Sequence, residues 1–278
     1  MDNSENKKIE VYKEAKTVQE MTQYLHDNKR VIYNEMSELE AQDALLKYNY
    51  INVITPFKHV FARKDSKEHE IRDNDNNHIY DNDVEFKSYY DCYKEERAKY
   101  PVLMKNILEF EANFNSLVSY EILVDTKSRI NTSEDLEYYL TSLQIKLLDS
   151  SEYETRIPHM KEHLTELINR IYKYHDVYCF FDRVSFGQLL TLFITLEKRK
   201  QFFIINKLKE FGWDFGVSQV PHFVKKVSMI IDIRNTLMHY NSLTILLRFC
   251  NAKKHEYRPI SDVRAHEKML AFLSKEKS

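Results

Sequence analysis

The sequence predicts an all-α protein, an antiparallel helical bundle preceded by an N-terminal helical extension. Apolar residues recur at helical spacing along most of the chain, and no segment alternates as a convincing strand would. Glycine is nearly absent, with 3 residues in 278. Because long helices joined by short connections pack against their neighbours, these observations favour an antiparallel bundle.

The N-terminal region, residues 1–72, is expected to be helical. Thr17 with Glu20, and Ser37 with Glu40, have the capping-box form, in which a hydroxyl and a carboxylate satisfy free amides at a helix start. Pro56 interrupts an aromatic and apolar run, so we expect a turn or a broken helix there.

Residues 73–83 are rich in Asp and Asn and form the clearest predicted boundary, because these side chains favour turns. A calcium loop is the alternative, since Asp73, Asp75 and Asn77 occupy its first three ligand positions. His78 stands where such a loop needs glycine, however, and Val84 replaces its final Glu. A turn is therefore favoured, and the main bundle is assigned to residues 84–278.

Beyond this boundary, the spacing of apolar residues predicts long helices. Their approximate ranges are 102–124, 133–148, 158–174, 185–211, 222–249 and 261–273.

Composition excludes several classes of protein. No Gly-rich phosphate loop is present, which excludes dinucleotide-binding folds and P-loop ATPases. Cys92, Cys179 and Cys250 are odd in number and far apart, which argues against a disulfide framework or a zinc–thiolate site. The N-terminus lacks the apolar core of a signal peptide, and no run approaches the roughly 18 apolar residues of a membrane span. We therefore expect a cytoplasmic protein without membrane contact.

Charge is distributed unevenly along the chain. Residues 183–278 hold 17 Lys and Arg against 8 Asp and Glu, whereas residues 1–182 carry a net charge of −11. The basic segment suggests contact with a polyanion, although two halves that neutralise each other remain an alternative. The candidate RNA-binding residues, which would make binding salt-dependent, are Lys198, Arg199, Lys200, Lys225, Lys226, Lys253 and Lys254. A solvated face accounts equally well for each cluster taken singly.

Three polar residues, Arg234, Asn235 and His239, interrupt the apolar helix predicted for residues 222–249. Burying such groups unpaired is costly, so they are expected to face a cleft or a partner. Asn235 and His239 are four residues apart and share a face, and Arg234 lies about 100° round from Asn235. One helix edge thus presents a permanent cation, an amide and a group that titrates near neutrality.

This stretch resembles the R-[polar]-x(3 to 5)-H signature of HEPN domains, helical bundles that include many RNA-cleaving toxins and CRISPR RNA-targeting nucleases. The wider chain resembles the Abi-like proteins of bacterial abortive infection, of the AbiD/AbiF type. Residues 44–52 with Pro56 and Phe57 are similar to the family's N-terminal block, and residues 108–115 to its acidic helix. The family usually has a basic residue where Asn115 stands, which argues against an ion pair from the acidic helix.

The resemblance implies a HEPN-like bundle and a metal-independent endoribonuclease of an antiphage abortive-infection or toxin–antitoxin system. RNA carries its own nucleophile, the 2′-hydroxyl. His239 can take its proton as a base or protonate the leaving 5′-oxygen, and Arg234 can stabilise the charge on the phosphate. Asn235 is expected to orient His239 or the phosphate. Family resemblance further implies a composite site in a homodimer, no cofactor, and a structured non-coding RNA as antitoxin.

Two other interpretations remain at this point. In the first, the chain is a non-catalytic helical module that binds RNA or protein, and Arg234 and His239 form a structural polar pair. In the second, His159 and His163, four residues apart on a helix, hold a metal ion; no third ligand is evident, and a solvated helix face is favoured.

Overall fold

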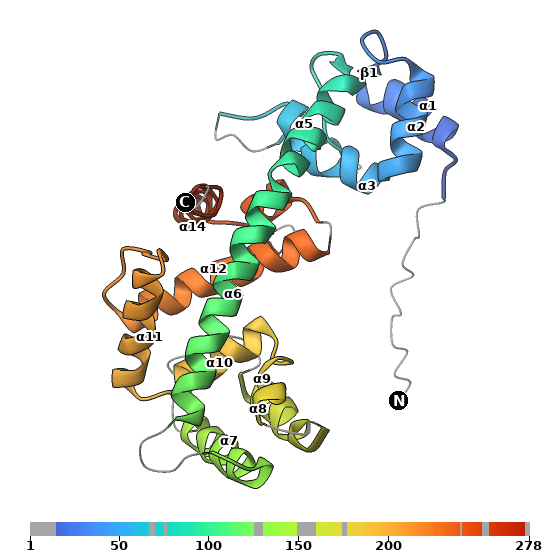
Figure 1. Ribbon diagram of the computed structural model, residues 1–278. Coiled ribbons are helices and arrows are strands. Elements are labelled where there is room, and N and C mark those ends of the chain that lie inside the picture. Colours follow the sequence, from blue (N-terminus) through green and yellow to red (C-terminus); the bar gives the residue numbers. More distant parts are fainter. Residues whose placement is uncertain are drawn as a thin grey trace, which may run out of the picture. The chain divides into compact units, whose positions relative to one another are not determined.

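The computed structural model describes residues 15–66, 70–74, 77–124, 130–148, 160–173, 177–239, 241–251 and 256–275. The chain divides into two compact units, Met1–Arg97 and Ala98–Ser278. Helices dominate both units, and the few strands are only two or three residues long (Figure 1). The all-α prediction is therefore confirmed.

The helices of the first unit are α1 (Val18–Lys29), α2 (Glu38–Tyr48), α3 (Tyr50–Val53), α4 (Lys58–Phe61) and α5 (Phe86–Ala98). Both predicted capping boxes are present, at Thr17 and Ser37. The predicted interruption at Pro56 is a 3-10 turn, Thr55–Phe57. Two short strands, β1 (Val31–Ile32) and β2 (Val84–Glu85), pair in parallel.

Helix α5 belongs to the first unit, although the predicted boundary at residues 73–83 placed it with the second. Phe86, Tyr89 and Tyr93 on α5 are buried in the core formed by α1 to α3. This burial explains why the division falls after Arg97. Residues before α5 form the expected turn, in which the Asp73 carboxylate accepts a hydrogen bond from the backbone N–H of Asn77 at 2.7 Å.

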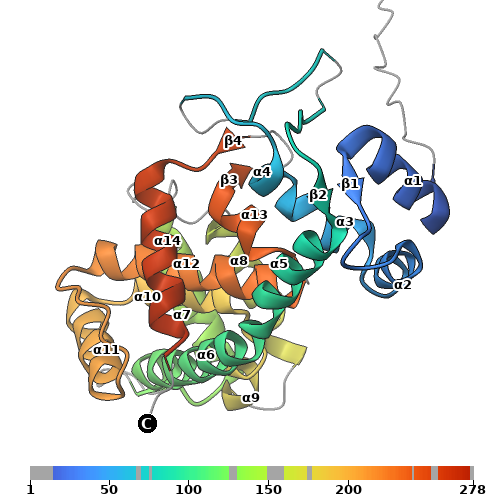
Figure 2. The ribbon, with the colours of Figure 1, turned by 90° about the horizontal axis from the view of Figure 1, so that it is seen from above.

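The second unit contains α6 (Tyr100–Leu123), α7 (Ser133–Leu148), α8 (Met160–Ile168), α9 (Val177–Phe181), α10 (Phe186–Thr195), α11 (Lys198–Glu210), α12 (Val220–Met238), α13 (Leu243–Arg248) and α14 (Ile260–Leu273). A 3-10 turn covers Ile171–Lys173, and strands β3 (Phe249–Asn251) and β4 (Glu256–Tyr257) pair antiparallel before α14. Helix α14 packs against α6, α12 and α13 (Figure 2). No helix in the described ranges is long and apolar enough to cross a membrane.

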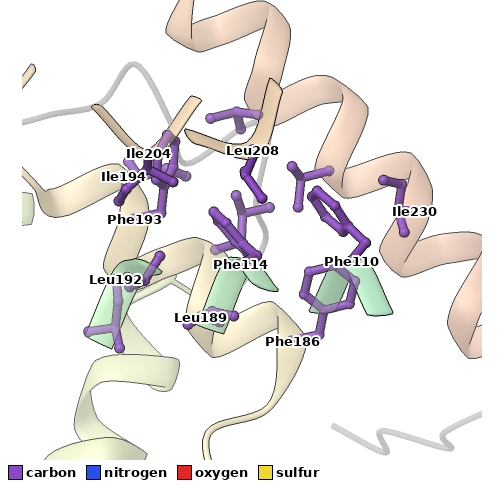
Figure 3. Close-up of a cluster of buried hydrophobic side chains, with 14 of the residues drawn as sticks. Phe110, Phe114, Phe186, Leu189, Leu192, Phe193, Ile194, Ile204, Leu208 and Ile230 are labelled. Carbon is purple, nitrogen blue, oxygen red and sulfur yellow. The ribbon is translucent and has the colours of Figure 1, made fainter. Parts of the chain in front are cut away.

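The core of the second unit is aromatic and centres on α6 (Figure 3). The ring of Phe114 on α6 lies 5.4 Å from Phe193 on α10 and 6.0 Å from Phe223 on α12. Phe110, one turn earlier, meets Phe186 and Trp213. Such ring pairs each add about 0.5–1.5 kcal/mol beyond the area that they bury. These pairs fix the N-terminal part of α12 against α6.

Two of the predicted long helices are each broken into two. The helix expected over 185–211 stops at Thr195 and restarts at Lys198, and the helix expected over 222–249 stops at Met238 and restarts at Leu243. At the first break, Gln201 Nε2 donates to the carbonyls of Phe193 and Ile194 at 3.1 and 2.9 Å. These bonds satisfy carbonyls that a continuous helix would have paired internally.

Candidate active site on helix α12

The guanidinium of Arg234 lies beside the Glu111 carboxylate of α6. Arg234 Nε and Glu111 Oε2 are 3.7 Å apart, and the two side chains are 30% and 19% exposed. Both atoms are buried, and neither makes a hydrogen bond within the described ranges, so charge attraction joins them. Burial raises the pKa of Glu111, and Arg234 offsets part of that rise. The departure from the family pattern at Asn115 weakened the case for an ion pair from the acidic helix, but Glu111 of that helix supplies one.

Nη1 and Nη2 carry the remaining donors of the Arg234 guanidinium. Arg234 Nη1 donates to the Asn235 side-chain oxygen at 3.4 Å, a long hydrogen bond. Among the residues that the structure describes, no bond occupies Nη2. A guanidinium held along one edge with its other edge available can bind a phosphate oxygen.

His239 occupies the position that ends α12. Its backbone N–H donates to the Asn235 carbonyl at 3.1 Å, and its φ of −92° and ψ of 12° leave the helix. The side chain is exposed, and in the described part of the chain it makes no hydrogen bond with the side chain of Arg234 or Asn235. The structure thus links Arg234 to Asn235 through side chains and links His239 to them through the backbone alone.

The segment after α12 is tied to the start of α6. The Tyr100 hydroxyl donates to the Asn241 carbonyl at 2.6 Å, and the Asn241 N–H donates to the Thr236 carbonyl at 2.9 Å. Tyr100 is almost fully buried. Since Asn241 follows His239 by two residues, these bonds fix the direction in which the chain leaves the candidate site.

The predicted RNA-binding residues are engaged to different degrees. Lys200 Nζ donates to the Glu121 carbonyl at the end of α6, and Lys225 pairs with Asp262 at 3.2 Å. Lys198, Arg199 and Lys226 have no carboxylate partner among the described residues. Lys253 and Lys254 lie outside the described residues.

His163, a candidate metal ligand, and Asn115, the departure from the family pattern, both make contacts within the fold. His163 Nδ1 lies 2.9 Å from the Thr191 hydroxyl, and its ring lies against Gly187, where a Cβ would approach it to 3.3 Å. His159 lies outside the described ranges. Asn115 Nδ2 donates to the Phe181 carbonyl at 3.0 Å. Within those ranges, no three His, Cys, Asp or Glu side chains are grouped so that they could hold a metal ion.

Comparison with known proteins returned no matching family model, no matching curated protein and no matching solved structure.

Glu111 is the residue of this site that sequence reasoning missed. It lies in the acidic helix that the sequence singled out, but the charge of Glu111 alone does not distinguish it from Glu109. A usable signal was its position one residue after Phe110 and three before Phe114, which places it beside the buried stripe of α6 and not opposite it.

Proposed function

We propose that the chain is a metal-independent endoribonuclease whose site is built on Arg234, Asn235 and His239 of α12. The observation that carries this proposal is the half-buried guanidinium of Arg234, fixed by Glu111 and Asn235, with an exposed imidazole five residues later at the helix end. A cation that is held in place can stabilise charge on a phosphate without the cost of reorganising. An imidazole can act as a general base or a general acid.

The reaction is an in-line transfer within the RNA strand. The 2′-oxygen forms a bond to phosphorus, the bond from phosphorus to the 5′-oxygen breaks, and Arg234 stabilises the added negative charge. A base removes the 2′-hydroxyl proton, and an acid protonates the leaving 5′-oxygen. The products are a 2′,3′-cyclic phosphate and a 5′-hydroxyl, so no water or metal ion enters the balance.

Two proton-transfer groups are needed, and each chain supplies one imidazole in this constellation. We propose that a second copy of the chain provides the other. Two exposed apolar side chains lie near site residues in the sequence: Met238, next to His239, and Leu108, one turn before Glu111, each 49% exposed. A contiguous exposed apolar patch marks an interface with a partner, and we propose that these two side chains belong to one. The protein then acts as a homodimer.

The resemblance of residues 44–57, 108–115 and 234–239 to Abi-like proteins suggests the biological setting. We propose an antiphage abortive-infection or toxin–antitoxin system in which the enzyme cuts cellular or phage RNA in the cytoplasm. A structured non-coding RNA would act as its antitoxin. The basic residues Lys198, Arg199 and Lys226, which have no carboxylate partner in the described ranges, are available for phosphate contacts.

The test is incubation of purified protein with total RNA in the presence of EDTA, followed by analysis of the fragment ends. Wild type is expected to leave 2′,3′-cyclic phosphates and 5′-hydroxyls. His239→Ala and Arg234→Ala are each expected to lower the rate by about 100-fold or more. His222→Ala is the matched control, because His222 lies on the same helix, near its other end. Full activity in His239→Ala, or a strict need for divalent metal, would exclude this mechanism.

A second candidate is a non-catalytic module that binds RNA or protein. The contact between Arg234 and Glu111 favours it, since an ion pair of this kind can serve structure alone. The same experiment separates the two. A binding module would retain RNA at low salt, leave it uncut, and be indifferent to His239→Ala.

A further inference from the structure

A cavity of about 270 Å³ lies between α11, the segment that follows it, and the start of α12. Its apolar lining consists of Phe202, Ile205, Trp213, Phe215, Val217 and Phe223. Polar side chains stand among them: Asn206, Lys209, Asp214 and Ser218. All of these residues belong to the second unit, and none belongs to the proposed catalytic site.

The end of α11 shapes this cavity. Gly212 has a φ of 88°, and the backbone N–H groups of Gly212 and Trp213 donate to the carbonyls of Lys209 and Leu208. This is the Schellman pattern, which reverses the chain at a helix end and suits glycine. The reversal places Trp213, which is 1% exposed, in the lining of the cavity.

One face of α11 carries cations on both sides of an exposed ring. Lys198, Phe202, Asn206 and Lys209 follow one another at intervals of three or four residues and so share a face. Phe202 is 42% exposed although it lines the cavity. Lys198 and the adjacent Arg199 have no carboxylate partner among the described residues, whereas Lys209 lies 3.1 Å from Asp214.

We propose that this cavity binds one unstacked nucleobase of a single-stranded RNA. The Phe202 ring offers a face for stacking, and the Asn206 amide offers a donor and an acceptor to the base edge. Lys198 and Arg199 lie one turn away, where the neighbouring phosphates of the strand would pass. The sequence of the second unit holds 26 Lys and Arg against 22 Asp and Glu, a net charge of +4 that matches a polyanionic strand.

The cavity is a subsite distinct from the catalytic residues. Phe223 and Arg234 are eleven residues apart on α12, a rise of about 16 Å. A strand that extends along α12 would therefore place its bound base away from the phosphate that is cut. The choice of RNA as the ligand rests on the proposed function, but binding of a base to this cavity can be measured without any cleavage.

The first experiment uses the full-length His239→Ala protein and a fluorescein-labelled ten-nucleotide oligoadenylate, with affinity measured by fluorescence anisotropy at several salt concentrations. Phe202→Ala is expected to weaken binding about 5-fold or more, because stacking of one base is lost. Phe203→Ala is the matched control: Phe203 is adjacent and 38% exposed but does not line the cavity. Lys198→Ala combined with Arg199→Ala is expected to flatten the salt dependence, which Phe202→Ala should leave unchanged.

The second experiment measures binding at the cavity itself through the fluorescence of Trp213. Trp213 is the only tryptophan of the chain, so its fluorescence reports on this cavity alone. Unlabelled oligoadenylate is expected to quench this fluorescence with the same affinity that anisotropy gives.

Equal effects of Phe202→Ala and Phe203→Ala on RNA affinity, or RNA binding without a change in Trp213 emission, would overturn the proposal. So would loss of self-association in Phe202→Ala at unchanged RNA affinity, since the cavity would then hold a protein side chain. Wild-type protein that binds RNA in this cavity but leaves it uncut would refute the proposed nuclease and leave this subsite standing.

Discussion

Arg234 and Glu111 illustrate how residue-scale chemistry depends on contacts across the fold. The local sequence indicates that Arg234 is out of place in an apolar helix, and burial of an unpaired guanidinium is costly. It does not indicate which carboxylate compensates the charge. Glu111 does so from α6 at 3.7 Å, and its own pKa is raised because burial outweighs the attraction of Arg234.

The raised pKa of Glu111 predicts a pH-dependent loss of stability. Because the folded state binds this proton more tightly than the unfolded chain, the favourable contribution is present below the ordinary value of 4.5. It is lost as pH rises through the raised folded pKa. Glu111→Gln removes the titrating group. The free energy of unfolding of Glu111→Gln minus that of wild type is therefore expected to increase as pH rises from 4.5 through the raised folded pKa. Urea unfolding at a series of pH values measures this difference.

Glu109→Gln is the control for this series, because Glu109 lies on the same helix and is exposed. Its difference from wild type should stay nearly constant with pH. A difference between Glu111→Gln and wild type that falls with pH would mean that Arg234 stabilises the ionised carboxylate more than burial destabilises it.

At the scale of elements, the two helix breaks position both candidate sites. The end of α12 at Met238 brings His239 to an exposed helix end, which a helix continuing to Phe249 would not do. The break between α10 and α11 turns the chain, so that α11 presents its own face of cations and Phe202. Neither break contains glycine or proline. The second break does carry a local signal, because the Ser242 hydroxyl caps the start of α13 by accepting from the Thr244 N–H.

Gln201 is expected to be important for the first of these breaks. It is 4% exposed, and its amide satisfies two carbonyls at the end of α10. Gln201→Leu keeps the size but leaves the Ile194 carbonyl without this donor, whereas the Phe193 carbonyl keeps the Leu196 N–H at 3.2 Å. We expect a loss of about 1–3 kcal/mol in the free energy of unfolding. Urea unfolding followed by circular dichroism measures it. Asn206→Ala, an exposed change on the same helix, should stay within about 0.5 kcal/mol. Equal stability of Gln201→Leu and wild type would show that the break needs no such cap.

At the scale of the whole molecule, the proposed reaction needs more than one chain. If each catalytic centre uses a histidine from both members of a symmetric dimer, an inactive partner also disables the active one. We therefore expect an equal mixture of wild type and His239→Ala, allowed to exchange subunits, to retain about one quarter of the activity of the same total amount of wild type. The assay is the initial rate of RNA cleavage after co-refolding or prolonged incubation.

Independent protomers would instead retain about one half, since the wild-type chains would be unaffected. Sedimentation of each pure protein over the same concentration range shows whether dimers form. Retention of one half by a mixture that sediments as dimers would assign both proton transfers to a single chain.

The sequence by itself determined the helical class, the capping boxes at Thr17 and Ser37, and the polar interruption at Arg234, Asn235 and His239. These features depend on local hydrogen bonds and on apolar spacing, which nearby residues specify. Only the tertiary structure decided that α5 belongs to the first core, that Glu111 faces Arg234, and that aromatic side chains from α11 and α12 enclose a cavity. These depend on contacts between residues far apart in the chain, and helical periodicity does not specify which helix faces meet.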